Sequence, residues 1–112
     1  MEQSPQAPLE TFKVLWHKDV QEDLKSLQKG FVESLIEGTV HKLSKAPHLI
    51  GQPLRGTMNR LWKVKYSKFR VVYTINRSAK EVWVLSVQKR EIIYEPRHLN
   101  HLMKLAAAIL AK

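Results

Sequence analysis

The sequence predicts an α+β domain: two N-terminal helices packed on one face of an antiparallel β-sheet, with an additional helix at the C-terminus. Two observations predict this class. First, one segment in which apolar and polar residues alternate is followed by two segments in which apolar residues recur with helical spacing. Second, three closely spaced segments typical of strands come next, and a helical stripe of apolar residues ends the chain. The 112 residues, 44% of them hydrophobic, suit one core. We expect a flexible tail over residues 1–10, the folded domain over 11–95 and the C-terminal helix over 96–112.

The first strand is predicted over Thr11–His17, where Phe12, Val14 and Trp16 occupy alternate positions. A helix is expected from Asp19, with Gly30 as its C-terminal cap. Its apolar stripe consists of Val20, Leu24 and Leu27.

The second helix is predicted from about Phe31 to Lys45, because Ala46-Pro47 ends it. Its inward residues would be Val32, Leu35, Ile36, Val40 and Leu43. Gly38 within this helix costs about 1 kcal/mol relative to alanine, so we interpret it as a site of close packing.

Two prolines and two glycines predict a loop over Pro47–Gly56, which leads into three strands. These strands are Arg60–Tyr66, Phe69–Asn76 and Glu81–Gln88. Their short connections favour antiparallel hairpins. Glu91–Tyr94 follows, and Pro96 then opens the last helix. That helix would bury Leu99, Leu102, Met103, Ala106 and Leu110.

A two-residue turn at Ser67-Lys68 sets the register of the first hairpin. It pairs Tyr66 with Phe69, Val64 with Val71 and Trp62 with Tyr73, which makes that face core. The other face then carries Lys63 and Lys65, with Arg70 directly opposite Lys65. Ser86 should fall near Arg70, and Arg90 should join the same face if strand geometry continues.

Positive charge is concentrated in the middle of the chain. Ten Lys/Arg and no Asp or Glu lie between Gly38 and Lys80, while the remainder carries nine basic and ten acidic residues. This distribution indicates a polyanion-binding surface. The alternative is a basic face that is merely solvated.

Several classes of function are disfavoured by composition. Without cysteine there is no disulfide, thiol nucleophile or cysteine zinc site, which is compatible with a reducing cytoplasm. The first ten residues do not resemble a signal peptide, and the longest apolar run, Leu105–Ala111, is far below the ~20 residues of a membrane helix. His98 and His101 are spaced i, i+3 but lack an evident third ligand. We therefore expect a cytoplasmic protein with no membrane, metal or cofactor requirement.

A cluster of lysines and arginines can also perform chemistry on a phosphodiester. Neighbouring positive charge disfavours the protonated form of a lysine, and a neutral lysine can act as a base. Arginine stays charged and can hold phosphate oxygens as negative charge develops in the transition state. The alternative is that the four cations expected on one face of the sheet only bind phosphate and take no part in chemistry. These cations are Lys63, Lys65, Arg70 and Arg90.

An ordered set of motifs resembles the RelE branch of the RelE/ParE toxin superfamily of type II toxin–antitoxin systems. The motifs are Pro53-Leu54-Arg55-Gly56, Leu61-Trp62-Lys63-Val64-Lys65-Tyr66, Phe69-Arg70-Val71-Val72-Tyr73 and Val87-Gln88-Lys89-Arg90-Glu91-Ile92-Ile93-Tyr94. The resemblance covers roughly Phe12 to Tyr94. It implies the RelE-like toxin fold over residues 11–95 and a metal-independent endoribonuclease that cleaves messenger RNA on the ribosome. The 2′-hydroxyl would attack the adjacent phosphate and leave a 2′,3′-cyclic phosphate. The implied partners are an antitoxin, in a hetero-oligomer, and the ribosome with its messenger.

The resemblance also implies roles for individual residues. Lys65 matches the general base and Lys63 its electrostatic neighbour, while Arg70 matches the arginine that stabilises the phosphate. Arg90 matches the residue that assists the leaving 5′-oxygen. Tyr94 resembles an aromatic that stacks on a base, although its ring could instead pack in the core. We expect further RNA contacts from Arg55, Arg60 and Lys68.

Two other functions compete with this interpretation. A ParE-like toxin would inhibit DNA gyrase on the same fold, but such sequences generally lack the pair formed by Lys63 and Lys65. A catalytically inactive RNA-binding relative is the second alternative, and sequence alone does not separate it from the enzyme. The last helix could cover core surface or serve as a contact for the partner.

Overall fold

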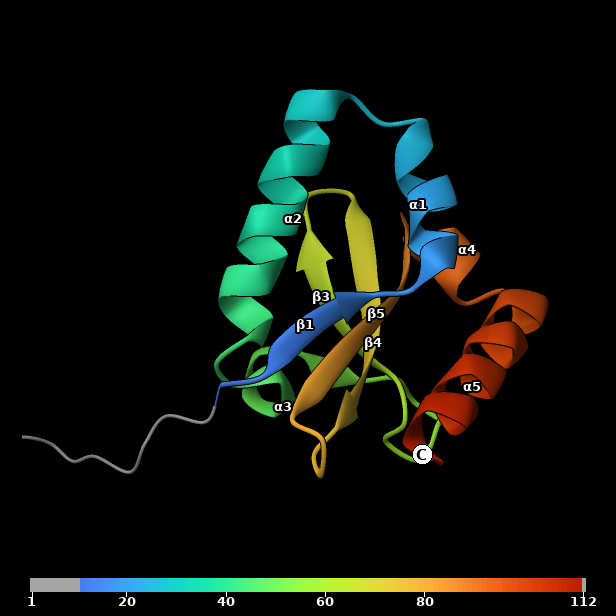
Figure 1. Ribbon diagram of the computed structural model, residues 1–112. Helices are drawn as coiled ribbons and strands as arrows, with labels where there is room; N and C mark the ends of the chain where they lie inside the picture. Colours follow the sequence, from blue (N-terminus) through green and yellow to red (C-terminus); the bar gives the residue numbers. More distant parts are fainter. Residues whose placement is uncertain (1–10, 112) are drawn as a thin grey trace, which may run out of the picture.

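Five strands form one sheet in the order β1-β5-β4-β3-β2 in the computed structural model, which describes residues 11–111 (Figure 1). The strands are β1 (Lys13–Trp16), β2 (Gln52–Pro53), β3 (Trp62–Tyr66), β4 (Phe69–Asn76) and β5 (Glu81–Lys89). The helices are α1 (Lys18–Lys25), α2 (Lys29–Leu43), α3 (Pro47–Ile50), α4 (Arg90–Ile93) and α5 (Pro96–Leu110). The expected tail over residues 1–10 and the final Lys112 lie outside the described residues.

The sheet is mixed, which corrects the expectation of an antiparallel sheet. β1 pairs in parallel with β5, with Lys13 opposite Glu81 and Trp16 opposite Val84. The other three pairings are antiparallel. β1 and β2 lie at opposite edges of the sheet, although β2 is the next strand along the chain. The segment that contains α1 and α2 therefore crosses from one edge of the sheet to the other. Local periodicity carries no information about which edge a first strand joins.

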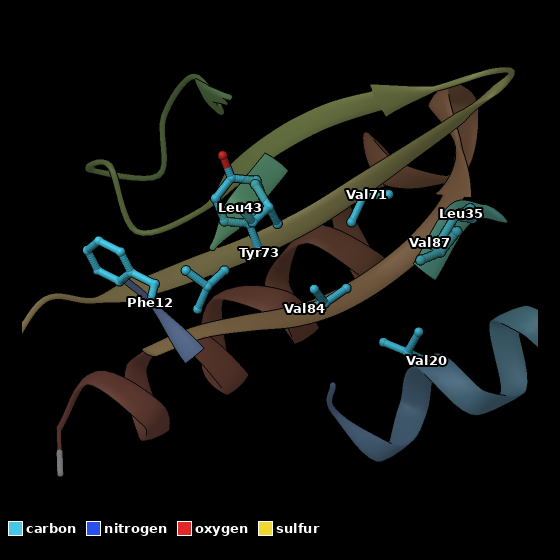
Figure 2. Close-up of a cluster of buried hydrophobic side chains, with 9 residues drawn as sticks. Phe12, Val20, Leu35, Leu43, Val71, Tyr73, Val84 and Val87 are labelled. Carbon is cyan, nitrogen blue, oxygen red and sulfur yellow. The ribbon is translucent and has the colours of Figure 1, made fainter. Parts of the chain in front are cut away.

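One face of the sheet forms a core with α1 and α2 (Figure 2). Its buried residues are Phe12, Val20, Leu35, Leu43, Val71, Tyr73, Val82, Val84 and Val87. Figure 2 shows Phe12, Leu43 and Tyr73 toward one end of this cluster and Val87 toward the other. Burying a side chain of this size contributes about 1.5–3 kcal/mol, so this layer supplies much of the driving force for folding.

A second core occupies the opposite face, where α4 and α5 pack. It consists of Leu54, Leu61, Val72, Leu85, Ile93, Leu102 and Ala106. Val71 and Val72 are adjacent in β4 yet belong to different cores, as the alternation of side chains along a strand requires. The additional C-terminal helix therefore covers the face of the sheet that α1 and α2 leave open.

The predicted register of the first hairpin is confirmed. Tyr66 pairs with Phe69, Lys65 with Arg70 and Trp62 with Tyr73. Ser86 lies on the same face as Arg70, as expected, but one pair further along the ladder, and a bulge between Val72 and Tyr73 sets this register. Ser86 lies opposite Val72, and Gln88 takes the place opposite Arg70.

The helical segments differ from the prediction in several details. Gly30 is the second residue of α2, because α1 ends earlier with Ser26 as its C-cap. Val40 was expected inside but is 37% exposed. The close packing at Gly38 is confirmed, since a Cβ there would lie 3.3 Å from the Tyr66 ring.

Two segments expected to be irregular or extended contain short regular elements. The predicted loop over Pro47–Gly56 holds α3 and β2. Pro47 at the first turn favours a helix, but four residues are too few to show a period. After β5 the strand does not continue, because Arg90 begins α4. Within residues 11–111 no helix is long and apolar enough to cross a bilayer.

Candidate functional site

Two adjoining hollows lie on the sheet face that carries the lysines of β3. The first, of about 420 Å³, is lined by Ile50, Gln52, Lys63, Val64, Lys65 and Arg70. The second, of about 590 Å³, is lined by Gln52, Pro53, Arg55, Lys63, Arg90 and Tyr94. Gln52 and Lys63 belong to both, so we treat the hollows as one site and call it the basic cleft. Its linings include five cations and no carboxylate.

The sheet positions the first three cations of the basic cleft. Lys63 and Lys65 alternate with the core residue Val64 in β3, and Arg70 is the direct partner of Lys65 in β4. Like charges directly opposed across a ladder destabilise a sheet by roughly 0.2–1 kcal/mol. The fold accepts this cost where an anionic ligand would remove it, which favours a binding role for these residues.

Lys63 is joined to Tyr94 across the cleft. Its Nζ donates a hydrogen bond of 2.6 Å to the Tyr94 hydroxyl, and it stands 5.2 Å from the centre of the ring. The two distances place the ammonium beyond the edge that carries the hydroxyl, so the contact is a hydrogen bond rather than a cation–π interaction. Tyr94 is 41% exposed, which excludes the core position considered as an alternative. Part of Tyr94 is therefore open to a ligand in the second hollow.

Arg90 and Arg55 reach the basic cleft from two different segments. Arg90 is the first residue of α4 and lies beside Tyr94, the C-cap of the same short helix. Arg55 follows β2. The four predicted cations converge, although Arg90 enters from a helix rather than from an extended strand. Two predicted RNA contacts, the exposed Arg60 and Lys68, line neither hollow.

A buried tyrosine fixes α3, whose Ile50 lines the basic cleft. The Tyr73 hydroxyl donates a hydrogen bond of 2.6 Å to the Pro47 carbonyl and thereby fixes α3 against the sheet. Burial raises the pKa of Tyr73 far above its usual range, so the hydroxyl keeps its proton. A Cβ on Gly51 would stand 1.9 Å from this hydroxyl and 2.8 Å from the Lys63 carbonyl, so only glycine allows the close approach.

Sequence reasoning missed Ile50, Gln52 and Pro53 in the lining of the cleft, because it assigned them to a loop. Gln52 pairs with Lys63 and Pro53 with Trp62. A two-residue edge strand that contains proline leaves almost no periodic signal. The nearby Gly51 is the one residue that could have indicated a close backbone approach.

Polar contacts from α1 fix the strand that leads to Arg90. Asp23 accepts hydrogen bonds from the Val87 backbone N–H at 2.9 Å and from the Gln88 side chain at 2.7 Å. Burial raises the pKa of Asp23, and the two hydrogen bonds partly oppose that rise. The end of β5 is thus tied to α1 directly before the chain enters the cleft.

The two histidines of α5 bind different partners. His98 Nε2 lies 2.9 Å from the Ser86 hydroxyl, while His101 Nε2 lies 3.0 Å from Asp19 Oδ2. Burial lowers the pKa of His98. Residues 11–111 hold no group of three side chains suited to a metal ion. The pair therefore fastens α5 to β5 and α1.

Comparison with known proteins places these features in a family of toxins. The toxin RelE of Mycobacterium tuberculosis is 28% identical over 72 residues, which cover 64% of this chain and 74% of the relative. The solved RelBE2 toxin–antitoxin complex of the same organism matches with a TM-score of 0.65 and 24% identity over 71% of this chain and 99% of that chain. The archaeal RelE–RelB complex of Pyrococcus horikoshii OT3 matches with a TM-score of 0.55 and 25% identity, over 71% of this chain and 96% of that chain. A mutant E. coli toxin RelE in the free state matches with a TM-score of 0.64 and 18% identity, over 85% of this chain and 97% of that chain. At this identity the match shows a similar fold.

The family assignment comes from the sequence itself. Residues 14–94, most of the chain, match the family described as the ParE toxin of the type II toxin–antitoxin system parDE. This region runs from β1 to Tyr94 and includes every residue that lines the basic cleft. The chain belongs to the ParE toxin family, within the RelE/ParE superfamily of toxins of type II toxin–antitoxin systems.

Proposed function

We propose that this toxin is a ribosome-dependent, metal-independent endoribonuclease that inhibits translation by cleaving messenger RNA in the basic cleft. The observation that carries the proposal is the convergence of Lys63, Lys65 and Arg70 in one hollow with Arg90 and Tyr94 in the next. A cleft of cations without a lining carboxylate suits a phosphodiester. The mixed polarity of the walls suits a nucleotide, since bases stack on aromatic surfaces while phosphates bind arginine and lysine.

The reaction requires a base, a stabiliser of the phosphate and a group at the leaving oxygen. Lys65, when neutral, accepts the proton of the 2′-hydroxyl, and that oxygen forms a bond to the adjacent phosphorus. Arg70 holds the non-bridging oxygens as negative charge develops on them. The bond from phosphorus to the 5′-oxygen breaks, and Arg90 stabilises this leaving oxygen until it takes a proton from water. The products are a 2′,3′-cyclic phosphate and a 5′-hydroxyl.

Lys63 and Tyr94 would order the substrate rather than exchange protons with it. The hydrogen bond from Lys63 fixes the Tyr94 ring at the wall of the second hollow. A base unstacked from its neighbours could then lie against the exposed ring face. Arg55, in the same hollow, would contact a neighbouring phosphate. Arg60 and Lys68 would contact RNA outside the cleft.

An ordered substrate explains why a ribosome would be required. Free messenger is flexible, and a small site that contains few binding groups cannot align the 2′-hydroxyl with phosphorus efficiently. The ribosome supplies a messenger held in a fixed path. We further propose a cytoplasmic protein whose antitoxin forms a hetero-oligomer with it, because the related RelE chains were solved as complexes with RelB.

The proposal is tested with Lys65→Ala and Arg90→Ala in single-turnover cleavage on programmed ribosomes. Each variant should lower the rate by about 10²–10⁴-fold and leave ribosome affinity within a few fold. Lys13→Ala removes one exposed charge on β1, at the edge of the sheet away from β2 and β3, and should keep the rate of the unmodified toxin. A parallel loss of affinity and rate, with no residual chemical defect, would make both residues docking contacts only.

Inhibition of DNA gyrase is the second candidate, and the match to the ParE toxin family favours it. Against it stands the Lys63/Lys65 pair opposite Arg70, an arrangement suited to a phosphodiester. A supercoiling assay with purified gyrase separates the two functions. The nuclease proposal expects no inhibition at concentrations at which ribosome-bound messenger is cut. An inactive RNA-binding relative would produce neither effect.

A further inference from the structure

Gln52 stands at the junction of the two hollows that form the basic cleft. It lines both hollows, and among the lining residues only Lys63 does the same. The two residues are direct partners across β2 and β3, so their side chains share one face of the sheet. Lys65 and Arg70 line one hollow with this pair, while Tyr94 lines the other. Gln52 therefore lies between the proposed phosphate site and the proposed place of a base.

The backbone that carries Gln52 is held on both sides. A Cβ on Gly51 would stand 2.8 Å from the Lys63 carbonyl, so the chain before Gln52 lies directly against β3. After Gln52, the Leu54 N–H donates a hydrogen bond of 2.9 Å to the Leu61 carbonyl. β2 is the last strand of the sheet, and the Gln52 side chain is exposed. The fixed backbone thus presents an accessible side chain to the cleft.

The side chain of Gln52 differs in chemistry from the other polar groups that line the basic cleft. The charged forms of the five cations donate hydrogen bonds and accept none. The Tyr94 hydroxyl already accepts the bond from Lys63. The amide of Gln52 carries a carbonyl acceptor beside two N–H donors, and within residues 11–111 no side chain or backbone group bonds to it. A neutral amide adds no attraction for phosphate, so this free acceptor and donor match the edge of a base.

Bases differ in the order of donors and acceptors along their edges. Adenine places its N6 amino donor beside the N7 acceptor, and a glutamine amide binds both at once. Guanine has acceptors at O6 and N7, which suit arginine instead. Both are purines, so stacking on Tyr94 favours them about equally. An amide at the junction of the hollows therefore distinguishes adenine from guanine.

We propose that Gln52 recognises the base that stacks on Tyr94 and makes adenine the preferred base there. The amide carbonyl accepts a hydrogen bond from the N6 amino group, and the amide N–H donates one to N7. The phosphodiester of this nucleotide then lies beside Lys65 and Arg70 in the adjoining hollow. Gln52 is a specificity residue and takes no part in the proton transfers. This assignment rests on the proposed nuclease function and names one base of its substrate.

The experiment uses transcripts on programmed ribosomes in which each nucleotide that flanks the cleaved bond is, in turn, adenine or guanine. At one of these positions the unmodified toxin should cut the adenine transcript about 5–150-fold faster, the discrimination expected of one bidentate pair. Gln52→Ala should bring this ratio close to one by slowing the adenine transcript, and Gln52→Arg should reverse the preference to guanine. Gln21→Ala is the matched control, because it removes an exposed glutamine of α1 that lines neither hollow and should leave the ratio unchanged.

Two results of the cleavage assay would overturn the assignment. The first is an unchanged ratio of adenine to guanine cleavage in Gln52→Ala. The second is an equal gain in rate for both transcripts in Gln52→Arg, which would make position 52 a phosphate contact only.

A binding measurement separates this assignment from the nuclease proposal. The programmed ribosomes carry a messenger with 2′-deoxynucleotides at the cleaved bond, which lacks the attacking hydroxyl and cannot be cut. The unmodified toxin should bind the adenine form more tightly than the guanine form, and Gln52→Ala should abolish the difference. If this difference is observed but no transcript is cut, the result contradicts the nuclease proposal alone. If transcripts are cut but neither assay distinguishes the two bases, the result contradicts the role of Gln52 alone.

Discussion

The hydrogen bond between Lys63 and Tyr94 links two residues that the sequence places 31 positions apart. Sequence reasoning left Tyr94 either stacked on a base or packed in the core, since its spacing of four residues after Arg90 is compatible with both. The structure excludes a core position, because Tyr94 is 41% exposed and its hydroxyl accepts a hydrogen bond from Lys63 of β3. The ring can thus offer a stacking face while its hydroxyl orients a cation of the cleft.

Two substitutions at Tyr94 separate the ring from the hydroxyl. Tyr94→Ala should reduce kcat/KM for ribosome-bound messenger by about 5–150-fold, because base–aromatic stacking contributes roughly 1–3 kcal/mol. Tyr94→Phe keeps the ring and should cost less than tenfold, the value of one solvent-accessible hydrogen bond. Single-turnover rates at several toxin concentrations measure both effects. Equal defects in the two variants would assign the function to the hydroxyl and not to stacking.

At the scale of elements, the sequence predicted the helices and strands that are long enough to show a periodic pattern of apolar residues. It missed the helices and strands that are too short to show one. Phe69–Asn76 and the helix that opens at Pro96 were predicted at their observed starts because alternation and helical spacing persist over many residues. The turn at Ser67 fixed the register that brings Lys65 opposite Arg70. α3, β2 and α4 are each four residues or fewer, so no period could reveal them. Of these, α3 and β2 carry the lining residues that sequence reasoning missed, Ile50, Gln52 and Pro53.

The polar contacts of α5 predict how stability depends on pH. Burial is the main cause of the lowered pKa of His98, with His101 adding to it, while Asp23 and Glu95 oppose it. A histidine whose folded pKa lies below its unfolded value, near 6.5, binds protons more readily in the unfolded chain. Its contribution is therefore complete above about pH 6.5 and is lost as pH falls through the lowered folded pKa.

We expect the free energy of unfolding to decrease as pH falls from about 7.5 to 5.5. His98→Gln keeps a hydrogen-bonding side chain near Ser86 and should flatten this slope. His101→Gln is the matched control on the same helix, and it should retain the decrease due to His98. Urea denaturation at the two pH values gives the free energies. An unchanged slope in His98→Gln would show that other groups determine the pH dependence.

At the scale of the whole molecule, the basic segment does not form one surface. Of the ten cations between Gly38 and Lys80, four line the basic cleft: Arg55, Lys63, Lys65 and Arg70. Lys80 instead directly precedes β5 near the other edge of the sheet, where its carbonyl accepts a hydrogen bond from the Lys13 N–H of β1. A sequence window cannot show this division, because the strand order determines where each cation lies.

An acidic antitoxin segment should cover or rearrange the basic cleft. Charge complementarity would accelerate the encounter, and apolar anchors, with α5 as the second contact, would slow dissociation. Hydrogen exchange of the free toxin and of the complex with the protein encoded beside it measures the contact. Protection is expected over residues 60–76 or 96–112. Protection confined to residues 18–45 would place the antitoxin on α1 and α2, away from the cleft.

The central claim is that the basic cleft cuts messenger RNA that the ribosome holds in place. The most direct measurement follows one transcript with the purified toxin, with and without programmed ribosomes, and identifies the new ends. The account predicts slow cleavage of free RNA, much faster cleavage on the ribosome, and a 2′,3′-cyclic phosphate beside a 5′-hydroxyl. Equal rates with and without ribosomes, or no cleavage in either case, would contradict it.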